Sequence, residues 1–127
     1  MFFMYSWYNN RSKSMRYFET KFLDEADEFI SKLDPKAARK IIYNIDLAEQ
    51  TNDPRLFKKL QKDIWEFRTK YVGLQIRLLA FWDKTDSKET LVIATHGFVK
   101  KVDKIPGNEI ERAERIRHKY FNNKVKK

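Results

Sequence analysis

Three short, mostly apolar runs lie close together in the middle of the chain and limit the folds open to it. Residues 64–69 alternate bulky apolar with charged side chains, residues 74–82 are apolar almost throughout, and residues 90–95 are mostly apolar. Such runs are typical of strands. The gaps hold turn residues, at 72–73 and 83–87. Strands in such close succession predict an antiparallel meander.

Two helices are expected before these strands. Residues 23–33 repeat apolar side chains at helical spacing, with acidic residues in the first turns, where the helix dipole favours them. Asp34 and Pro35 then supply a cap and a first-turn proline for a second helix. That helix ends near residues 51–54, because the residue before Pro54 avoids the helical region. Together they predict an antiparallel helical hairpin.

Two further elements complete the expected fold. Residues 18–22 add an edge strand, and Pro106-Gly107 breaks the chain before a closing helix, for which Asn108 and Glu111 form a capping box. This order predicts an α+β fold: an N-terminal helical hairpin packed on a small, mainly antiparallel twisted sheet, with a closing C-terminal helix. We expect the helices to cover one face of the sheet and to leave the other face open to solvent.

Composition excludes several classes of protein. The chain has no cysteine, so disulfides, thiolate metal sites and cysteine nucleophiles are impossible. No apolar stretch approaches the roughly 20 residues of a membrane helix, and the aromatic N-terminus lacks the form of a secretory signal. We therefore expect a cytoplasmic protein. Residues 1–15 are expected to be an extension, disordered or not native, and residues 16–127 a single domain.

The positive charge is confined to one part of the chain. Residues 1–54 carry 8 Lys and Arg against 9 Asp and Glu, whereas residues 55–127 carry 19 against 9. The second part therefore holds the whole excess of a chain with a formal net charge of +9. Such a field concentrates polyanions, most commonly nucleic acid, although a solvated lysine-rich surface is the alternative. The basic residues do not form one amphipathic helix, so we expect no membrane binding.

Arg77 lies in the middle of an apolar run, where an unpaired charge is costly to bury. Either it reaches a carboxylate such as Glu66 on the neighbouring strand, or it opens onto a groove that binds an anion. Arg68 lies two residues from Glu66 and hence on the same strand face, which we expect to be the open one. The planar guanidinium suits phosphate, so both arginines are candidate anion ligands.

The segment THGFVKK follows the third expected strand. Gly97 permits a sharp bend, so we expect the strand to leave the sheet here. Phe98 either fills the core or stacks on a base, and His96 is either structural or a proton carrier with a free pKa near neutrality. Lys100 and Lys101 point in opposite directions in an extended chain, so only one faces a given groove.

No metal site or cofactor is expected. The two histidines form no HxH or HExxH spacing, and the three glycines are too far apart for a phosphate-binding loop. Cleavage of RNA would then proceed by attack of the ribose 2′-hydroxyl on the adjacent phosphate. That reaction needs groups that take and give a proton, and cations where charge develops on the phosphorane oxygens.

The segments IWEFR, IRLLAFW and THGFVKK, followed by Ile105-Pro106 and a basic helix, resemble the RelE/ParE superfamily of bacterial toxins. Within it they are most similar to the HigB-like branch, described as phage-derived toxin-like proteins. The resemblance covers about residues 16–121. It implies a RelE-like microbial RNase fold and the toxin of a type II toxin–antitoxin system. Members of the RelE and HigB branches cleave mRNA in the ribosomal A site without metal.

The resemblance also implies roles for individual residues. Arg68 and Arg77 would bind and stabilise the scissile phosphate, Lys101 or Lys100 would assist them, and His96 would transfer protons. The expected catalytic residues are thus Arg68, Arg77, His96 and Lys101, and the expected RNA-binding residues are Lys58, Lys59, Lys62, Glu66, Lys100 and Tyr120. For Tyr120, a place in the core is the alternative, because it lies on the closing helix.

The partners implied are the ribosome, mRNA and a cognate antitoxin. The antitoxin is expected to be a helix-turn-helix, HigA-like protein, with an acidic or amphipathic segment that covers the basic region. Two alternatives remain: ParE-like members share the fold and poison DNA gyrase, and an inactive relative would bind RNA without cleaving it.

Overall fold

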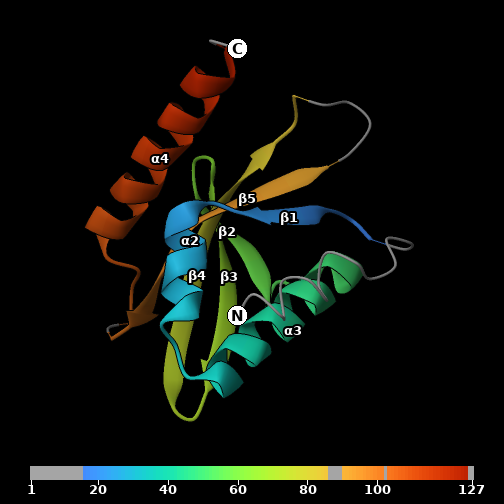
Figure 1. Cartoon of the computed structure of the whole chain (residues 1–127), viewed down its shortest axis with the longest axis vertical. Helices are drawn as coiled ribbons and strands as arrows, with labels where there is room; N and C mark the ends of the chain where they lie inside the picture. Colours follow the sequence, from blue (N-terminus) through green and yellow to red (C-terminus); the bar gives the residue numbers. More distant parts are fainter. Residues whose placement is uncertain (1–15, 86–89, 102, 126–127) are drawn as a thin grey trace.

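The computed structural model describes residues 16–85, 90–101 and 103–125. Its elements are β1 (Glu19–Phe22), α2 (Asp24–Ser31), α3 (Pro35–Thr51), β2 (Phe57–Gln61), β3 (Ile64–Tyr71), β4 (Leu74–Asp83), β5 (Leu91–Lys100) and α4 (Gly107–Val125) (Figure 1). The expected extension at residues 1–15 lies outside the described residues, as do residues 86 and 87 of the expected turn. Within the described ranges, no helix is long and apolar enough to cross a lipid bilayer.

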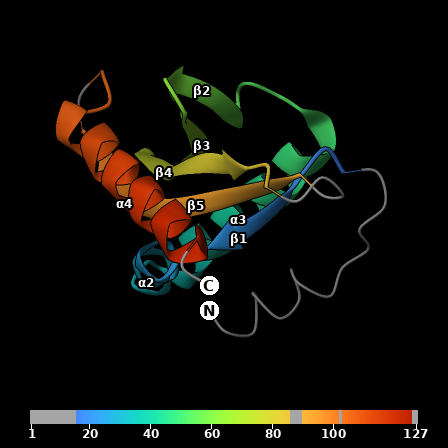
Figure 2. The same ribbon diagram turned by 90° about the horizontal axis from the view of Figure 1, so that it is seen from above.

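The strands form one sheet in the order β1-β5-β4-β3-β2, which the labels of Figure 2 follow. β3, β4 and β5 pair antiparallel in succession, which confirms the meander. β1 is an edge strand, as predicted, and runs parallel to β5. The sequence pattern did not predict β2, which pairs antiparallel with β3 and forms the opposite edge. The α+β class is thereby confirmed.

The α3 helix begins and ends where the sequence predicts. Asp34 accepts a hydrogen bond from the backbone N–H of Lys36 at 3.0 Å, and Pro35 occupies the first turn. The helix ends at Thr51, and Asn52 follows in the left-handed conformation with φ of 54°. A left-handed residue after the last turn is a common way to end a helix. Local sequence signals are therefore sufficient for this element.

The α4 helix begins earlier than the expected capping box allows. Its first residue is Gly107, so Asn108 lies inside the first turn and does not cap it. The carbonyl of Pro106 accepts the first hydrogen bond, from the backbone N–H of Glu109 at 3.0 Å. The predicted capping box of Asn108 and Glu111 is therefore wrong. A proline just before the helix fixes its own φ near the helical value, which favours this earlier start.

The α2 and α3 helices cover one face of the sheet. α2 packs mainly on β5 and α3 on β3, and the two helices lie together in front of the strands in Figure 1. Their apolar side chains and alternate strand positions form one cluster, in which Ile30, Ile41, Ile76 and Val92 are fully buried. Full burial of such a side chain contributes about 1.5–3 kcal/mol. Apolar packing therefore holds the hairpin to the sheet.

The α4 helix packs on the opposite face of the sheet. Ala113 is buried there against Leu79, Phe81 and Ile93, with Ile110 beside them. The prediction that all helices cover one face is therefore wrong, because the apolar stripe of the closing helix also has to be buried. A pocket lies at the edge of β3 and takes its lining from this face, beside Arg68, and from α3 on the other.

Strand β5 is longer than the sequence predicts. It runs to Lys100, and Gly97 lies within it, opposite Leu78 of β4. The predicted bend at Gly97 is wrong, and the need for glycine is steric. A Cβ at this position would lie 2.3 Å from Cδ2 of Phe29 on α2. Gly97 thus makes room for a ring from a distant part of the chain, and its neighbours in sequence give no sign of this.

One extra residue interrupts the pairing of β5 with β4. Leu79 lies opposite His96 and Ala80 lies opposite Ala94, so Thr95 forms a β-bulge. The fully buried Thr95 hydroxyl donates a hydrogen bond to the Leu79 carbonyl at 3.1 Å. This bond satisfies the polar group that the bulge places in the interior.

Candidate functional site

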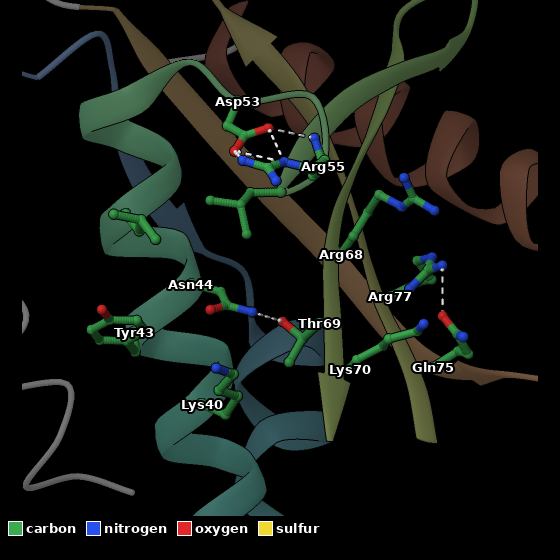
Figure 3. Close-up of a pocket in the computed structure, with 12 residues that line it drawn as sticks. Lys40, Tyr43, Asn44, Asp53, Arg55, Arg68, Thr69, Lys70, Gln75 and Arg77 are labelled. Atoms are coloured by element: carbon green, nitrogen blue, oxygen red, sulfur yellow. Dashed lines mark hydrogen bonds and ion pairs between the residues drawn. The ribbon is translucent and has the colours of Figure 1, made fainter. Parts of the chain in front are cut away.

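A pocket of about 600 Å³ lies between α3 and the second half of β3. β2 pairs with β3 only as far as Phe67, and the pocket lies beyond that point (Figure 3). Its lining consists of Lys40, Tyr43, Asn44, Leu47, Asp53, Arg55, Leu56, Arg68, Thr69, Lys70, Gln75 and Arg77. Five of these residues are cationic and one is acidic, so this Arg68 pocket suits an anion.

The lining comes from three parts of the chain. In Figure 3, Arg68, Arg77 and Gln75 project from β3 and β4 on the side away from α3. From α3, Asn44 reaches β3 and donates a hydrogen bond to the Thr69 hydroxyl at 3.3 Å. This contact holds α3 against β3 at one side of the pocket.

The loop before β2 supplies a cation that is already paired. Arg55 forms an ion pair with Asp53, with Nη2 and Oδ2 2.8 Å apart. Hydrogen bonds from Arg55 lower the pKa of Asp53, which therefore stays ionised. Since both groups are accessible to water, this pair contributes little stability and leaves the net charge of the pocket to its other cations.

Arg77 is buried in an ion pair with Glu66. Its Nε lies 3.2 Å from Glu66 Oε1, and the two side chains are 2% and 3% exposed. The remaining guanidinium nitrogens donate to the Ile76 carbonyl at 3.1 Å and to Gln75 Oε1 at 3.2 Å. Of the two interpretations of Arg77, the structure shows the pairing with a carboxylate. Burial lowers the pKa of Arg77, and Glu66 opposes that shift.

Arg68 is the accessible member of the arginine pair. It lies directly opposite Arg77 in the β3–β4 register, and 33% of its side chain is exposed. Its Nε is 3.8 Å from Glu66 Oε2, too far for a hydrogen bond. One carboxylate oxygen of Glu66 therefore pairs with Arg77, and the other faces Arg68. The exposed Lys70 lies two residues further on the same face of the strand.

His96 lies beneath α4 and not in the Arg68 pocket. Only 1% of it is exposed, and its Nε2 is 3.1 Å from Glu109 Oε1. Its Nδ1 is 3.0 Å from Thr95 Oγ1, so both ring nitrogens have a partner within hydrogen-bond distance. Burial and nearby Arg112 lower the pKa of His96, while Glu109 raises it.

The two lysines after His96 lie at the end of β5. Lys100 is opposite Gln75 in the register, so its side chain is on the same face as a residue that lines the Arg68 pocket. Lys101 is exposed, follows the strand and does not line the pocket. Phe98 is partly buried against the cluster beneath α4, as expected of a core residue.

The other expected RNA-binding residues lie elsewhere. Lys58 and Lys59 are exposed on β2, where Lys58 lies opposite Glu66 and shares its face of the sheet, whereas Lys59 lies opposite Trp65 on the other face. Lys62 is exposed in the turn that follows. Tyr120 donates a hydrogen bond to Asp83 Oδ2 at 2.6 Å, at the far end of β4 from Arg77. Burial and this carboxylate both raise the pKa of Tyr120. The structure thus brings Arg68, Arg77 and Glu66 together, with Lys58 and Lys100 on the same face of the sheet, and leaves His96, Lys59, Lys62, Lys101 and Tyr120 apart.

Several lining residues were absent from the predicted set. Lys70 could have been found, because it follows Arg68 at the spacing of one strand face. Lys40 and Arg55 come from α3 and the next loop, and no local pattern places them beside β3. In the ranges that the structure covers, no group of three or more His, Cys, Asp or Glu residues is placed to hold a metal ion.

The sequence matches a described protein family over most of this domain. Residues 28–118 match the family of phage derived proteins that are Gp49-like (DUF891), and the chain belongs to this family. The match confirms the phage-derived branch that the strand motifs indicated.

Among solved structures, one match is a chain of the RelBE2 toxin–antitoxin complex from Mycobacterium tuberculosis. The identity is 19%, the alignment covers 65% of this chain and 98% of that chain, and the TM-score is 0.42. No curated protein matches the sequence.

Proposed function

We propose that this chain is the toxin of a type II toxin–antitoxin system of the RelE/HigB kind and cleaves mRNA on the ribosome in the cytoplasm. Membership of the Gp49-like family and the positive charge of residues 55–127 support this proposal. The Arg68 pocket is the observation that carries it. Cleavage through the 2′-hydroxyl needs fixed cations where negative charge develops on the phosphorane, and this pocket offers them.

In this proposal Arg68 contacts the scissile phosphate. Its guanidinium is the accessible one of the pair, and Lys70 adds a second exposed cation on the same strand face. Arg77 is a positioning residue. It neutralises Glu66 and holds that carboxylate beside Arg68 Nε, which keeps the Arg68 side chain over the pocket. Lys100 adds charge on the same face at the neighbouring strand.

His96 is the proton-transfer group in this proposal, on one condition. Because Nε2 faces Glu109 and the ring is buried, the first turn of α4 has to move before His96 can reach RNA. We expect His96→Ala to lower cleavage by about 10²–10⁴-fold, as for loss of a general acid or base. We expect Glu109→Ala to retain cleavage, because it uncovers the ring. Equal losses in both variants would show that the contact is structural.

The proposed partner is an antitoxin encoded beside this gene. We expect it to be a helix-turn-helix protein with an acidic segment, because the basic excess of residues 55–127 would otherwise attract nucleic acid. Co-expression with the neighbouring open reading frame should restore growth of cells that produce the toxin.

The burial of Arg77 and His96 favours a second candidate, an RNA-binding relative that does not cleave. Two of the expected catalytic groups are 2% and 1% exposed in this conformation. RNA binding would then depend on Arg68, Lys70 and the exposed lysines, and the bound RNA would not be cleaved.

Induced expression of the intact chain separates these candidates. We expect translation to stop rapidly and mapped message ends to lie inside translated coding regions. Arg68→Ala should relieve the arrest, whereas Lys36→Ala, an exposed lysine on α3 outside the pocket, should not. RNA binding with intact messages would indicate the second candidate. A DNA damage response with intact messages would indicate a gyrase poison and contradict both.

A further inference from the structure

A second groove lies between the β2–β3 turn, the end of β4 and the second half of α4. Its volume is about 600 Å³, and it shares no lining residue with the Arg68 pocket. We call it the tryptophan groove, because Trp65 and Trp82 form part of its wall. None of its residues takes part in the proposed cleavage chemistry, so that chemistry does not account for the groove.

The aromatic wall of the tryptophan groove is partly exposed and well supported. The rings of Trp65 and Trp82 meet edge to face with centroids 5.6 Å apart, and both side chains are partly exposed. Behind them, Phe57 stacks on Trp65 with centroids 5.0 Å apart. Packing against core rings fixes the orientation of both indoles. They therefore form a rigid surface on which a flat group can stack at low entropic cost.

Cations surround this aromatic wall. Lys59, Lys62, Lys84 and Arg117 line the groove against a single acid, Asp63. Two of them already lie over aromatic rings: Lys84 Nζ is 5.6 Å from the Trp82 centroid, and the Arg117 guanidinium carbon is 5.3 Å from that of Phe121. Asp63 Oδ2 is 3.5 Å from Arg117 Nη2, which leaves three exposed lysines as the excess charge.

Rigid aromatic faces interleaved with mobile cations are the features that bind single-stranded nucleic acid. Bases stack on the rings, and phosphates pair with the cations. A small apolar ligand would have no use for four cations. An acidic peptide would pair with the lysines but would leave the exposed indoles without a matching group.

We infer that the tryptophan groove is a second nucleic-acid site, which binds single-stranded RNA with bases stacked on Trp65 and Trp82 and phosphates held by Lys59, Lys62 and Lys84. The inference rests on the proposed function for its choice of RNA as the ligand. Trp65 and Arg68 are three residues apart on β3, or about 10 Å along the strand. They point to opposite faces of the sheet, so the groove is a binding site separate from the Arg68 pocket.

Binding of an RNA that cannot be cleaved tests this inference separately from catalysis. The probe is a 2′-O-methyl RNA of about eight nucleotides, within the range of single-stranded binding sites. We expect it to quench the tryptophan fluorescence of the native chain. Lys59→Ala combined with Lys62→Ala should weaken binding about tenfold and reduce the slope of log K against log salt by about two. The control replaces Lys21 and Lys36, two exposed lysines outside the groove.

A second variant tests the aromatic wall. Trp82→Leu should weaken binding of the same RNA by about tenfold with an unchanged salt slope, because stacking is lost and no phosphate contact changes. Thermal unfolding identifies any loss of fold. If Trp82→Leu does not fold, the lysine pair still decides, since both lysines are exposed and their removal leaves the core intact.

Three results distinguish the possible failures. Native affinity in the lysine variant would overturn the inference. Native RNA affinity with loss of antitoxin binding would also overturn it, and would identify a protein-binding surface instead. Loss of RNA binding in the lysine variant of a chain that cleaves no message would support the inference while the nuclease proposal fails.

Discussion

The two faces of the sheet are held to their helices by different forces. Under α2 and α3 lies a large apolar cluster, with Ile30 and Ile41 fully buried. Under α4 the apolar cluster is smaller, and polar contacts lie near both ends of the helix, from Glu109 to His96 and from Lys124 to Asp83. The first face should therefore respond to changes of shape, and the second to changes of charge, pH and salt.

The largest effect is expected for Glu66→Ala on the α4 face. This change leaves Arg77 buried without its carboxylate, and breaking one partner of a buried ion pair costs about 3–5 kcal/mol. Urea unfolding measures the loss. As a control, Glu66→Met together with Arg77→Met should be close to native stability, because it removes both charges. A loss below about 1 kcal/mol for the single variant would contradict the buried pair.

A purely steric change tests the other face. Gly97→Ala should lower the free energy of unfolding by about 1–3 kcal/mol, because the added Cβ meets the Phe29 ring. Gly107→Ala is the matched control, since a Cβ there meets nothing within 4 Å, and it should cause no loss. Adding Phe29→Leu to Gly97→Ala should restore part of the stability. Strictly additive losses would show that the two residues do not touch.

Asp83→Asn tests the response to pH beneath α4. Burial alone would raise the pKa of Asp83, but hydrogen bonds from Lys124, Thr85 and Tyr120 lower it overall. A carboxylate with a lowered folded pKa stabilises the protein above its unfolded pKa of about 4, and this contribution is lost as the pH falls below that value. We expect the variant to be about 1–2 kcal/mol less stable at pH 7.

The same prediction fixes the behaviour in acid. The stability difference between the native chain and Asp83→Asn should shrink as the pH falls below about 4, because the Asp83 carboxyl of the unfolded chain then takes up a proton while that of the folded chain is still ionised. Chemical unfolding at a series of pH values measures it. A difference that stays constant down to pH 2 would show that Asp83 contributes by its shape alone.

The smallest effect is expected for Arg112→Ala. Arg112 and Glu25 form an ion pair between α4 and α2 at 2.6 Å, with side chains 44% and 49% exposed. Exposed pairs contribute about 0–1 kcal/mol, and salt screens them. Any difference from the native chain should therefore disappear in about 1 M salt, whereas the loss from Gly97→Ala should be unaffected. A loss that is the same at both salt concentrations would show that Arg112 acts through packing.

Much of the fold could be predicted because its signals are local. The helices at 24–31 and 35–51 follow apolar periodicity and a proline cap, and the meander follows alternation and turn residues. Strand β2 was missed because FKKLQ places two adjacent lysines where a strand face would alternate. The face covered by α4 was missed because periodicity shows that a helix has an apolar stripe but not which surface receives it.

Less of the candidate site could be predicted. The pairing of Glu66 with Arg77 was foreseen as one of two alternatives, because a charge in an apolar strand needs a partner. For His96 a structural role was also one of two alternatives, but its contact with Glu109 was not foreseen, since it depends on where α4 places Glu109. For the same reason the tryptophan groove is invisible in the sequence, as its rings and cations come from β2, β3, β4 and α4.

The single unpaired position at Thr95 shifts the phase of every side chain that follows it on β5. If Thr95 were instead paired with Leu79, His96 and Phe98 would lie on the same face as Ala94, among the aliphatic groups beneath α2. Gly97 would then lie on the opposite face. Regular pairing of Thr95 would thus turn the strand inside out over its second half, with an imidazole forced against Phe29, whereas deleting Thr95 would leave His96 opposite Leu79. The extra residue therefore determines which face of the sheet receives His96 and Phe98, and a deletion is better tolerated here than at any paired position of β5.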